Sequence, residues 1–158
     1  MKSNTSRALG TLLLSLLAFS VAAEELMITN PWVRSAPPNA PALGVFMKLS
    51  NHSSDEIAVV EVRTSLEVSH AEMHRTVMTD GVMKMIPQKQ IPVAAHSSTE
   101  LKPGSWHIML MQPEQVPVMG DSVHLTLVLS DGTEQMVVAT VRKGEMKMDS
   151  HSHEMKMD

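Results

Sequence analysis

The chain has 158 residues, a formal net charge of −4, and 15 methionines beside two phenylalanines and no tyrosine; this length suits one domain. An acidic chain without a basic run argues against binding to nucleic acid and to anionic membrane surfaces. The absence of cysteine excludes a disulfide framework and thiolate metal ligands.

The first 23 residues have the pattern of a secretory signal peptide. The basic residues Lys2 and Arg7 precede the apolar run ALGTLLLSLLAF at 8–19. This run is shorter than the roughly 20 residues that span a bilayer. The next residues, SVAAEE, place small side chains before a predicted cleavage site after Ala23. We therefore expect export to the periplasm with cleavage near Ala23. We expect no lipid anchor, because no cysteine follows the run.

Short segments of alternating apolar and polar residues follow along the rest of the chain, separated by turn residues. Asp80-Gly81 and Asp131-Gly132 are typical of hairpin turns, since glycine accepts a positive φ without cost. Many short strands at this spacing favour an antiparallel β-sandwich or barrel. We expect strands near 26–34, 43–51, 56–63, 67–78, 82–87, 98–102, 106–112, 122–130 and 134–142.

The predicted β-sandwich domain covers residues 24–143, and residues 144–158 form a predicted flexible, disordered C-terminal tail. The sequence contains no G-x-S-x-G turn, no Gly-rich phosphate loop, no H-E-x-x-H pair and no cysteine nucleophile. We therefore do not expect an enzyme.

The segment SWHIMLM (105–111) places potential metal ligands along one face of a predicted strand. Alternate residues of a strand point to opposite faces. One face then carries Trp106, Ile108 and Leu110, which form an ordinary core face. The other carries His107, Met109 and Met111, each about 7 Å from the next. Taken alone, this second face also fits Met109 and Met111 packed under a loop, with His107 as a surface histidine whose hydrogen bonds are satisfied.

Two further segments combine histidine and methionine. GVMKMIP places Met83 and Met85 on one face after the Asp80-Gly81 turn. SHAEMHRTVM contains His70, Met73, His74 and Met78. Taken singly, each of these residues is more typical of core packing or of a solvated surface, because methionine fills irregular gaps well.

Taken together, histidine and methionine side chains without thiolate are typical of a copper site. Thioethers are soft, uncharged donors that suit Cu(I), and imidazole binds both copper oxidation states. Zinc prefers Cys, His and carboxylate, whereas calcium and magnesium need oxygen ligands. Neutral donors leave Cu(I) with its single positive charge, so we expect moderate hold and easy release, which suits carriage better than permanent storage.

The segments AEMHRTVMTDGVMKM and ELKPGSWHIMLM resemble the periplasmic copper chaperones of the PCuAC family. That family's signature is a His or Met, ten residues, a Met, twenty-one residues and then His-x-Met. Here His74 is followed by ten residues and Met85, and twenty-one further residues lead to His107 and, after one residue, Met109. The resemblance extends over residues 28–141.

The resemblance implies a single cupredoxin-like Greek-key β-sandwich that binds one Cu(I) near its surface. The implied ligands are His74, Met85, His107 and Met109. It also implies a metallochaperone that carries copper in the periplasm to the CuA-bearing subunit of cytochrome oxidase; whether a Sco-type thioredoxin-like protein cooperates stays open. We expect a monomer. Four residues fall outside the signature. We expect Met73, Met83 and Met111 to pack or to make soft contacts outside the ligand set, and we expect His70 to be solvated.

The tail departs from the minimal family pattern, because GEMKMDSHSHEMKMD contains the unit EMKMD twice. Some family members carry similar His- and Met-rich extensions. Methionine pairs suit a second Cu(I), while imidazole and carboxylate suit Cu(II), which favours nitrogen and oxygen. A solvated polar tail without metal is the alternative. The auxiliary candidates are Met146, Met148, His151, His153, Met155 and Met157.

Two other functions stay open. A periplasmic copper-buffering or resistance protein would use the same ligands without a dedicated acceptor. A β-sandwich assembly or adhesion module would use its methionines for packing only. Stoichiometric Cu(I) binding separates the last function from the first two, and copper transfer to an acceptor separates a chaperone from a buffer.

Overall fold

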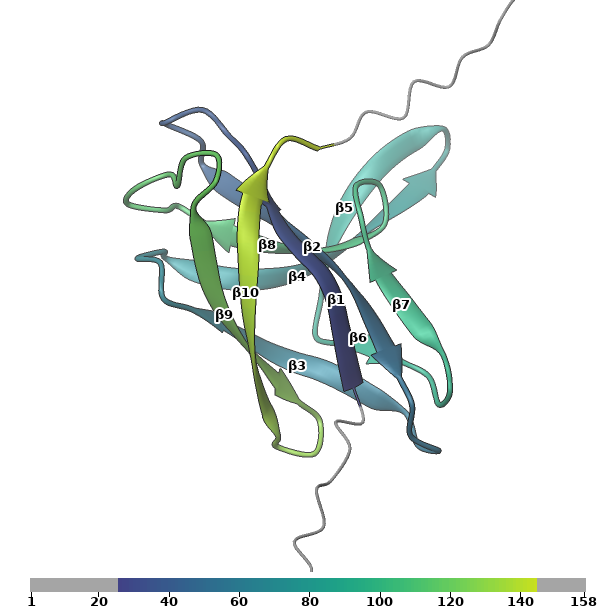
Figure 1. Ribbon diagram of the computed structural model, residues 1–158. Helices are drawn as coiled ribbons and strands as arrows, with labels where there is room; N and C mark the ends of the chain where they lie inside the picture. The colour runs from purple at the N-terminus through teal and green to yellow at the C-terminus, as the bar shows by residue number, and fades with distance from the viewer. Residues whose placement is uncertain (1–25, 145–158) are drawn as a thin grey trace, which may run out of the picture.

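The computed structural model describes residues 26–144, which form ten β-strands joined by turns and loops (Figure 1). The predicted signal peptide at 1–23 and the tail ligands predicted at 146–157 lie outside the described residues. No helix within 26–144 has the length and apolarity needed to cross a membrane. The strands are β1 (Leu26–Arg34), β2 (Ala42–Asn51), β3 (Ile57–Thr64), β4 (His70–Thr79), β5 (Val82–Gln88), β6 (Ile91–Val93), β7 (Ser98–Leu101), β8 (Trp106–Met111), β9 (Ser122–Leu129) and β10 (Glu134–Arg142).

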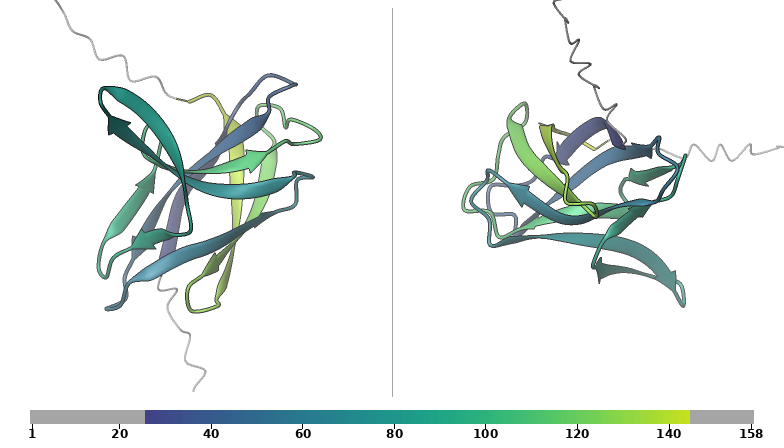
Figure 2. Two further views of the ribbon diagram at one scale, coloured as in Figure 1. Left: turned by 180° about the vertical axis from the view of Figure 1, so that it is seen from behind. Right: turned by 90° about the horizontal axis from the view of Figure 1, so that it is seen from below.

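The strands form one mixed sheet in the order β5-β4-β8-β7-β2-β1-β10-β9-β3-β6, and β2 also pairs with β8. The sheet curls back on itself, so that its two halves enclose a common core (Figures 1 and 2). The predicted all-β, single-domain fold is confirmed. The pairing is not wholly antiparallel as expected, because β1 runs parallel to β10 and β7 runs parallel to β8.

Several strand ends differ from the prediction by one residue, and two differences are larger. The strand expected to begin at residue 67 begins at His70. The sequence pattern does not predict β6, because this strand has only three residues with Pro92 in the middle. Proline has no N–H to donate and is tolerated at a sheet edge, and β6 is an edge strand that pairs only with β3.

The alternation of residues along the central strands builds the core. On β8, Ile108 and Leu110 are completely buried, as predicted, and β9 alternates in the same way. Trp106 at the start of β8 is only half-buried, with the Arg75 guanidinium 5.3 Å from its ring centroid. Each fully buried side chain of this size contributes roughly 1.5–3 kcal/mol to the free energy of unfolding. The core face of β8 is therefore a strong constraint on which way its other face points.

The strands β4 and β5 form a hairpin at one end of the sheet, which extends away from the body of the molecule (Figure 1). Asp80 and Gly81 form its two-residue turn with φ values of 52° and 75°. Two central residues with positive φ are typical of the tight turns that join antiparallel strands, so the predicted hairpin is confirmed. The turn fixes the register of β4 against β5, and thus which side chains of the two strands are opposite each other.

Candidate metal centre

The four predicted ligands lie on one face of β5, β4 and β8. His74 of β4 and His107 of β8 are directly opposite each other, so their side chains point the same way. Their ring centroids are 5.6 Å apart in an edge-on arrangement. Met109 follows His107 by two residues, and Met85 of β5 is opposite Thr76, two residues after His74. The two-residue period of a strand therefore puts all four side chains on a common face.

His107 is 3% exposed, and its ring is held in a defined orientation. Its Nδ1–H donates a hydrogen bond to the carbonyl oxygen of Ser105 at 3.0 Å. Its Nε2 is buried and has no hydrogen-bond partner among residues 26–144. Buried polar atoms normally have a partner, and a proton on Nδ1 of the neutral ring leaves a free lone pair on Nε2. The alternative of a satisfied surface histidine is therefore wrong for His107, which is buried and has one ring nitrogen without a partner in the described part of the chain.

His74 shows the same arrangement with its two ring nitrogens exchanged. Its Nε2 lies 2.7 Å from Oε2 of Glu72, and its Nδ1 is buried with no hydrogen-bond partner in the described part of the chain. The other oxygen of Glu72 lies 2.8 Å from Nε2 of His70. Hydrogen bonds to His70 and then to His74 hold the pKa of the Glu72 carboxyl below its usual value. A carboxylate behind an imidazole is typical of metal-binding histidines.

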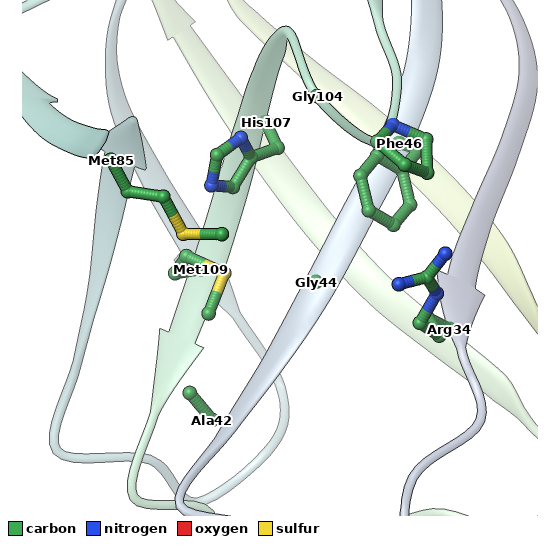
Figure 3. Close-up of a pocket in the computed structure, with 9 residues that line it drawn as sticks. Arg34, Ala42, Gly44, Phe46, Met85, Gly104, His107 and Met109 are labelled. Carbon is green, nitrogen blue, oxygen red and sulfur yellow. The ribbon is translucent and has the colours of Figure 1, made fainter. Parts of the chain in front are cut away.

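A cavity of about 250 Å³ opens beside these histidines. Met85, His107 and Met109 line it, and Figure 3 shows their side chains pointing toward one another. Met85 is 63% exposed, whereas Met109 is partly buried. His74 is not among the lining residues and meets the cavity through its ring contact with His107. The structure thus brings two thioethers and one imidazole together, with the second imidazole next to the first.

Phe46 and Arg34 form the other wall of the cavity (Figure 3). Gly44 leaves room for this wall, since a Cβ at that position would lie 3.0 Å from the Phe46 ring. The Arg34 guanidinium lies 5.9 Å from the centroid of the same ring. None of the residues that line the cavity is acidic. The cavity therefore has uncharged donors on one side and an aromatic and cationic wall on the other.

This donor set suits a soft cation better than a hard one. Among residues 26–144, no three His, Cys, Asp or Glu side chains are grouped so that they could hold a metal ion. A metal centre at this cavity therefore depends on thioether sulfur together with imidazole nitrogen. Such donors suit Cu(I), whereas zinc prefers Cys, His and carboxylate, and calcium and magnesium need oxygen.

The four residues outside the signature take different positions. Met73 is 8% exposed and belongs to the core, as expected, and His70 is exposed. Met111 is partly buried and follows Met109 on the same face of β8. Met83 is 59% exposed, so it does not pack in the core.

Three residues around the cavity and its histidines are not predicted from the sequence: Glu72, Gly44 and Phe46. Glu72 precedes His74 by two residues, so the strand period alone places its carboxylate on the face of the histidine. That spacing is a signal that could have identified it. Gly44 and Phe46 come from β2, and only the pairing of β2 with β8 puts Gly44 opposite Met109. No local pattern in the sequence indicates that contact.

We expect the His107 imidazole of the copper-free protein to stay neutral in mildly acidic solution. Burial disfavours the charged ring and lowers the pKa of His107 below its ordinary value of 6.5, and this effect outweighs the hydrogen bond to Ser105, which raises the pKa. A pH titration of the ring ¹⁵N shifts should therefore give a midpoint below 6.5, with the neutral ring protonated on Nδ1. A midpoint above 6.5, or a neutral ring protonated on Nε2, would contradict this assignment.

A family model and a curated relative match most of the described chain. The family model described as "Putative lipoprotein LpqE-like" matches residues 26–141. The relative Lxx21020 of Leifsonia xyli subsp. xyli is 31% identical over 121 residues. That match covers 76% of this chain and 71% of the relative.

Two solved structures are similar to this chain. The Cu(I) form of DR1885 from Deinococcus radiodurans is 28% identical, with a TM-score of 0.59 over 80% of this chain and 84% of that chain. The copper-bound PCuAC domain from PmoF2 is 19% identical, with a TM-score of 0.65 over 78% of this chain and 97% of that chain. At its lower identity, the second similarity shows the fold alone.

Proposed function

Because the chain belongs to the LpqE-like family, which is equivalent to the PCuAC family of copper-binding domains, we propose that it is an exported Cu(I) chaperone that delivers copper to a CuA-type centre of a respiratory oxidase. It is a PCuAC-like copper-binding domain. The similar solved structure of DR1885 holds Cu(I), which supports copper as the cargo of this chain. The homologous copper chaperones are not enzymes.

The observation that carries the proposal is the pair of buried, unpartnered ring nitrogens. Nε2 of His107 and Nδ1 of His74 have no hydrogen-bond partner among residues 26–144, although the second nitrogen of each ring is hydrogen-bonded. Leaving buried polar atoms unsatisfied costs about 1–3 kcal/mol each. A bound cation would satisfy both lone pairs. We therefore assign His74, Met85, His107 and Met109 as the Cu(I) ligands.

The exposure of Met85 suits release to an acceptor. This side chain is 63% exposed on the edge strand β5, while His107, which lines the same cavity, is buried. A partner can therefore approach the ion from the side of Met85 and replace the thioether first. All four donors are neutral, so the bound Cu(I) keeps its positive charge and is not held by charge neutralisation.

Delivery is tested by mixing the Cu(I)-loaded protein with the copper-free CuA domain of an oxidase. We expect copper to move to the CuA domain, because thiolate ligands there hold copper more strongly than neutral thioethers. The acceptor's absorption reports the transfer. A copper-buffering or resistance protein without a dedicated acceptor would give no direct transfer, and oxidase assembly in a deletion strain would stay normal at limiting copper.

Replacing Glu72 with alanine is expected to weaken Cu(I) binding about 10–100-fold, the usual cost of losing a partner that orients a metal-binding histidine. The Glu72 carboxylate fixes the ring of His74 through a 2.7 Å hydrogen bond. Competition for Cu(I) against a coloured chelator measures the change. His70→Ala is the matched control, since His70 binds the other oxygen of Glu72 and is exposed. Equal losses in the two variants would contradict an orienting role for Glu72.

Export and the tail are part of the same proposal. The family description as lipoproteins supports an exported protein, with the signal at 1–23 cleaved near Ala23.

Gly144, the last described residue, packs against Arg34 of the cavity wall. A Cβ at Gly144 would lie 2.9 Å from the Arg34 guanidinium. The tail thus starts beside the cavity, and we propose that its histidines and methionines collect Cu(II) or a second Cu(I). Separate titrations of the full chain and a chain ending at Gly144 test this.

A further inference from the structure

The β4–β5 hairpin carries three exposed methionines. Met78, Met83 and Met85 are 66%, 59% and 63% exposed. The other exposed methionines of residues 26–144, which are Met27, Met119 and Met136, each belong to a different part of the fold. Large apolar side chains in water forgo the free energy of burial, so three of them on one short hairpin need a reason.

The register of the hairpin groups these side chains on one face. Met78 is directly opposite Met83, and Met85 follows Met83 by two residues on β5. Directly opposite residues have Cβ atoms about 4.5–5.5 Å apart, and diagonal neighbours such as Met78 and Met85 lie within reach of long side chains at roughly 7–8 Å. The three thioethers therefore form a triangle that flexible methionine side chains can close around one ion.

The same face continues into the proposed copper site. Met85 lines the cavity together with His107 and Met109, so it belongs both to the triangle and to the site. Met78 and Met83 lie farther toward the Asp80-Gly81 turn. The exposed end of the hairpin is thus connected to the buried histidines through one shared sulfur ligand.

We propose that Met78, Met83 and Met85 form a second, all-thioether Cu(I) position through which copper enters and leaves the main site. The proposal rests on the proposed function, because it uses Met85 as a ligand of both positions. Three neutral sulfur donors without carboxylate or imidazole select Cu(I) over Cu(II) and zinc. A partner can reach this position without opening the cavity, since all three side chains are exposed.

The handover is a ligand exchange without electron or proton transfer. Copper stays Cu(I) throughout and keeps its bond to the sulfur of Met85. The bonds to Met78 and Met83 break while bonds to His74, His107 and Met109 form. Nε2 of His107 needs no deprotonation, because the ring proton is on Nδ1, where it is hydrogen-bonded to Ser105.

The test is an anaerobic Cu(I) titration of the full chain with ¹³C-labelled methionine methyl groups. We expect the first equivalent to shift the methyl signals of Met85 and Met109, and further Cu(I) to shift those of Met78 and Met83. Residue-specific signals separate these from the tail methionines. Methyl signals of Met78 and Met83 that stay unchanged in excess Cu(I) would overturn the proposal. If the signals of Met85 and Met109 also stay unchanged, the proposed function fails as well.

The double variant Met78→Leu/Met83→Leu separates coordination from protein docking. Leucine preserves volume and apolar surface and is usually tolerated in place of methionine, but it has no sulfur donor. We expect Cu(I) transfer to a soluble chelator to slow about tenfold, with the affinity of the main site unchanged. Met136→Leu, at an 89% exposed methionine on β10, is the matched control. Transfer at the wild-type rate in the double variant would overturn the handover.

Discussion

His107→Ala is expected to abolish stoichiometric Cu(I) binding by the folded domain. Losing the partner that orients a metal ligand already costs about 10–100-fold in affinity, and the loss of the ligand itself should exceed that. His107 is buried, with one nitrogen fixed by Ser105 and the other without a partner in the described part of the chain, so no nearby side chain of the cavity can replace it without rearrangement. Competition against a Cu(I) chelator with a chain ending at Gly144 gives the affinity without the tail.

Two further variants make this result specific. His107→Leu refills the volume that alanine leaves empty, so a loss of binding in both variants cannot come from a collapsed cavity. His124→Ala removes an exposed histidine of β9, outside the copper-site face, and should leave the affinity unchanged. Retention of one tightly bound Cu(I) by His107→Ala would contradict the proposed ligand set.

Ile108→Ala is expected to lower mainly the stability of the protein, and Met109→Ala mainly its Cu(I) affinity, although the two residues are neighbours on β8. Ile108 is completely buried, and truncating such a side chain to alanine costs about 2–5 kcal/mol of the free energy of unfolding. Met109 is partly buried and lines the cavity. Truncation of Met109 should lower the free energy of unfolding less than truncation of Ile108 does. It should remove most of the Cu(I) affinity. Urea unfolding of the copper-free protein and chelator competition measure the two quantities.

Stability and Cu(I) affinity must both be measured for each β8 variant. The midpoint of the urea transition should fall for Ile108→Ala with little change in its slope, as expected for a lost core contact. The same variant should still bind one Cu(I) while it is folded. Leu110→Ala, on the core face of the same strand, should behave like Ile108→Ala. Loss of Cu(I) binding in these two core variants, with stability unchanged, would show that the faces of β8 are assigned the wrong way round.

The sequence predicts most of the strands because their local signals are strong. Alternation at Ile108 and Leu110 identifies the core face of β8, and Asp80-Gly81 identifies the β4–β5 turn. It fails for β6, whose pairing depends on the neighbouring β3 rather than on its own three residues. It also fails for the parallel pairs, since strand direction is decided by connections through the whole fold.

By itself, the sequence determined which donors are available and which of them share a strand face. Cysteine is absent, methionine is abundant, and the resemblance to the PCuAC signature selects four candidates between His74 and Met109. Only the tertiary structure decided that His74 is opposite His107, that each ring has one buried nitrogen without a partner among residues 26–144, and that His74 is hydrogen-bonded to Glu72. The reason is physical. The alternation of residues along a strand fixes the face to which each side chain points. The burial and the hydrogen-bond partners of a nitrogen depend on segments that meet only when the sheet closes.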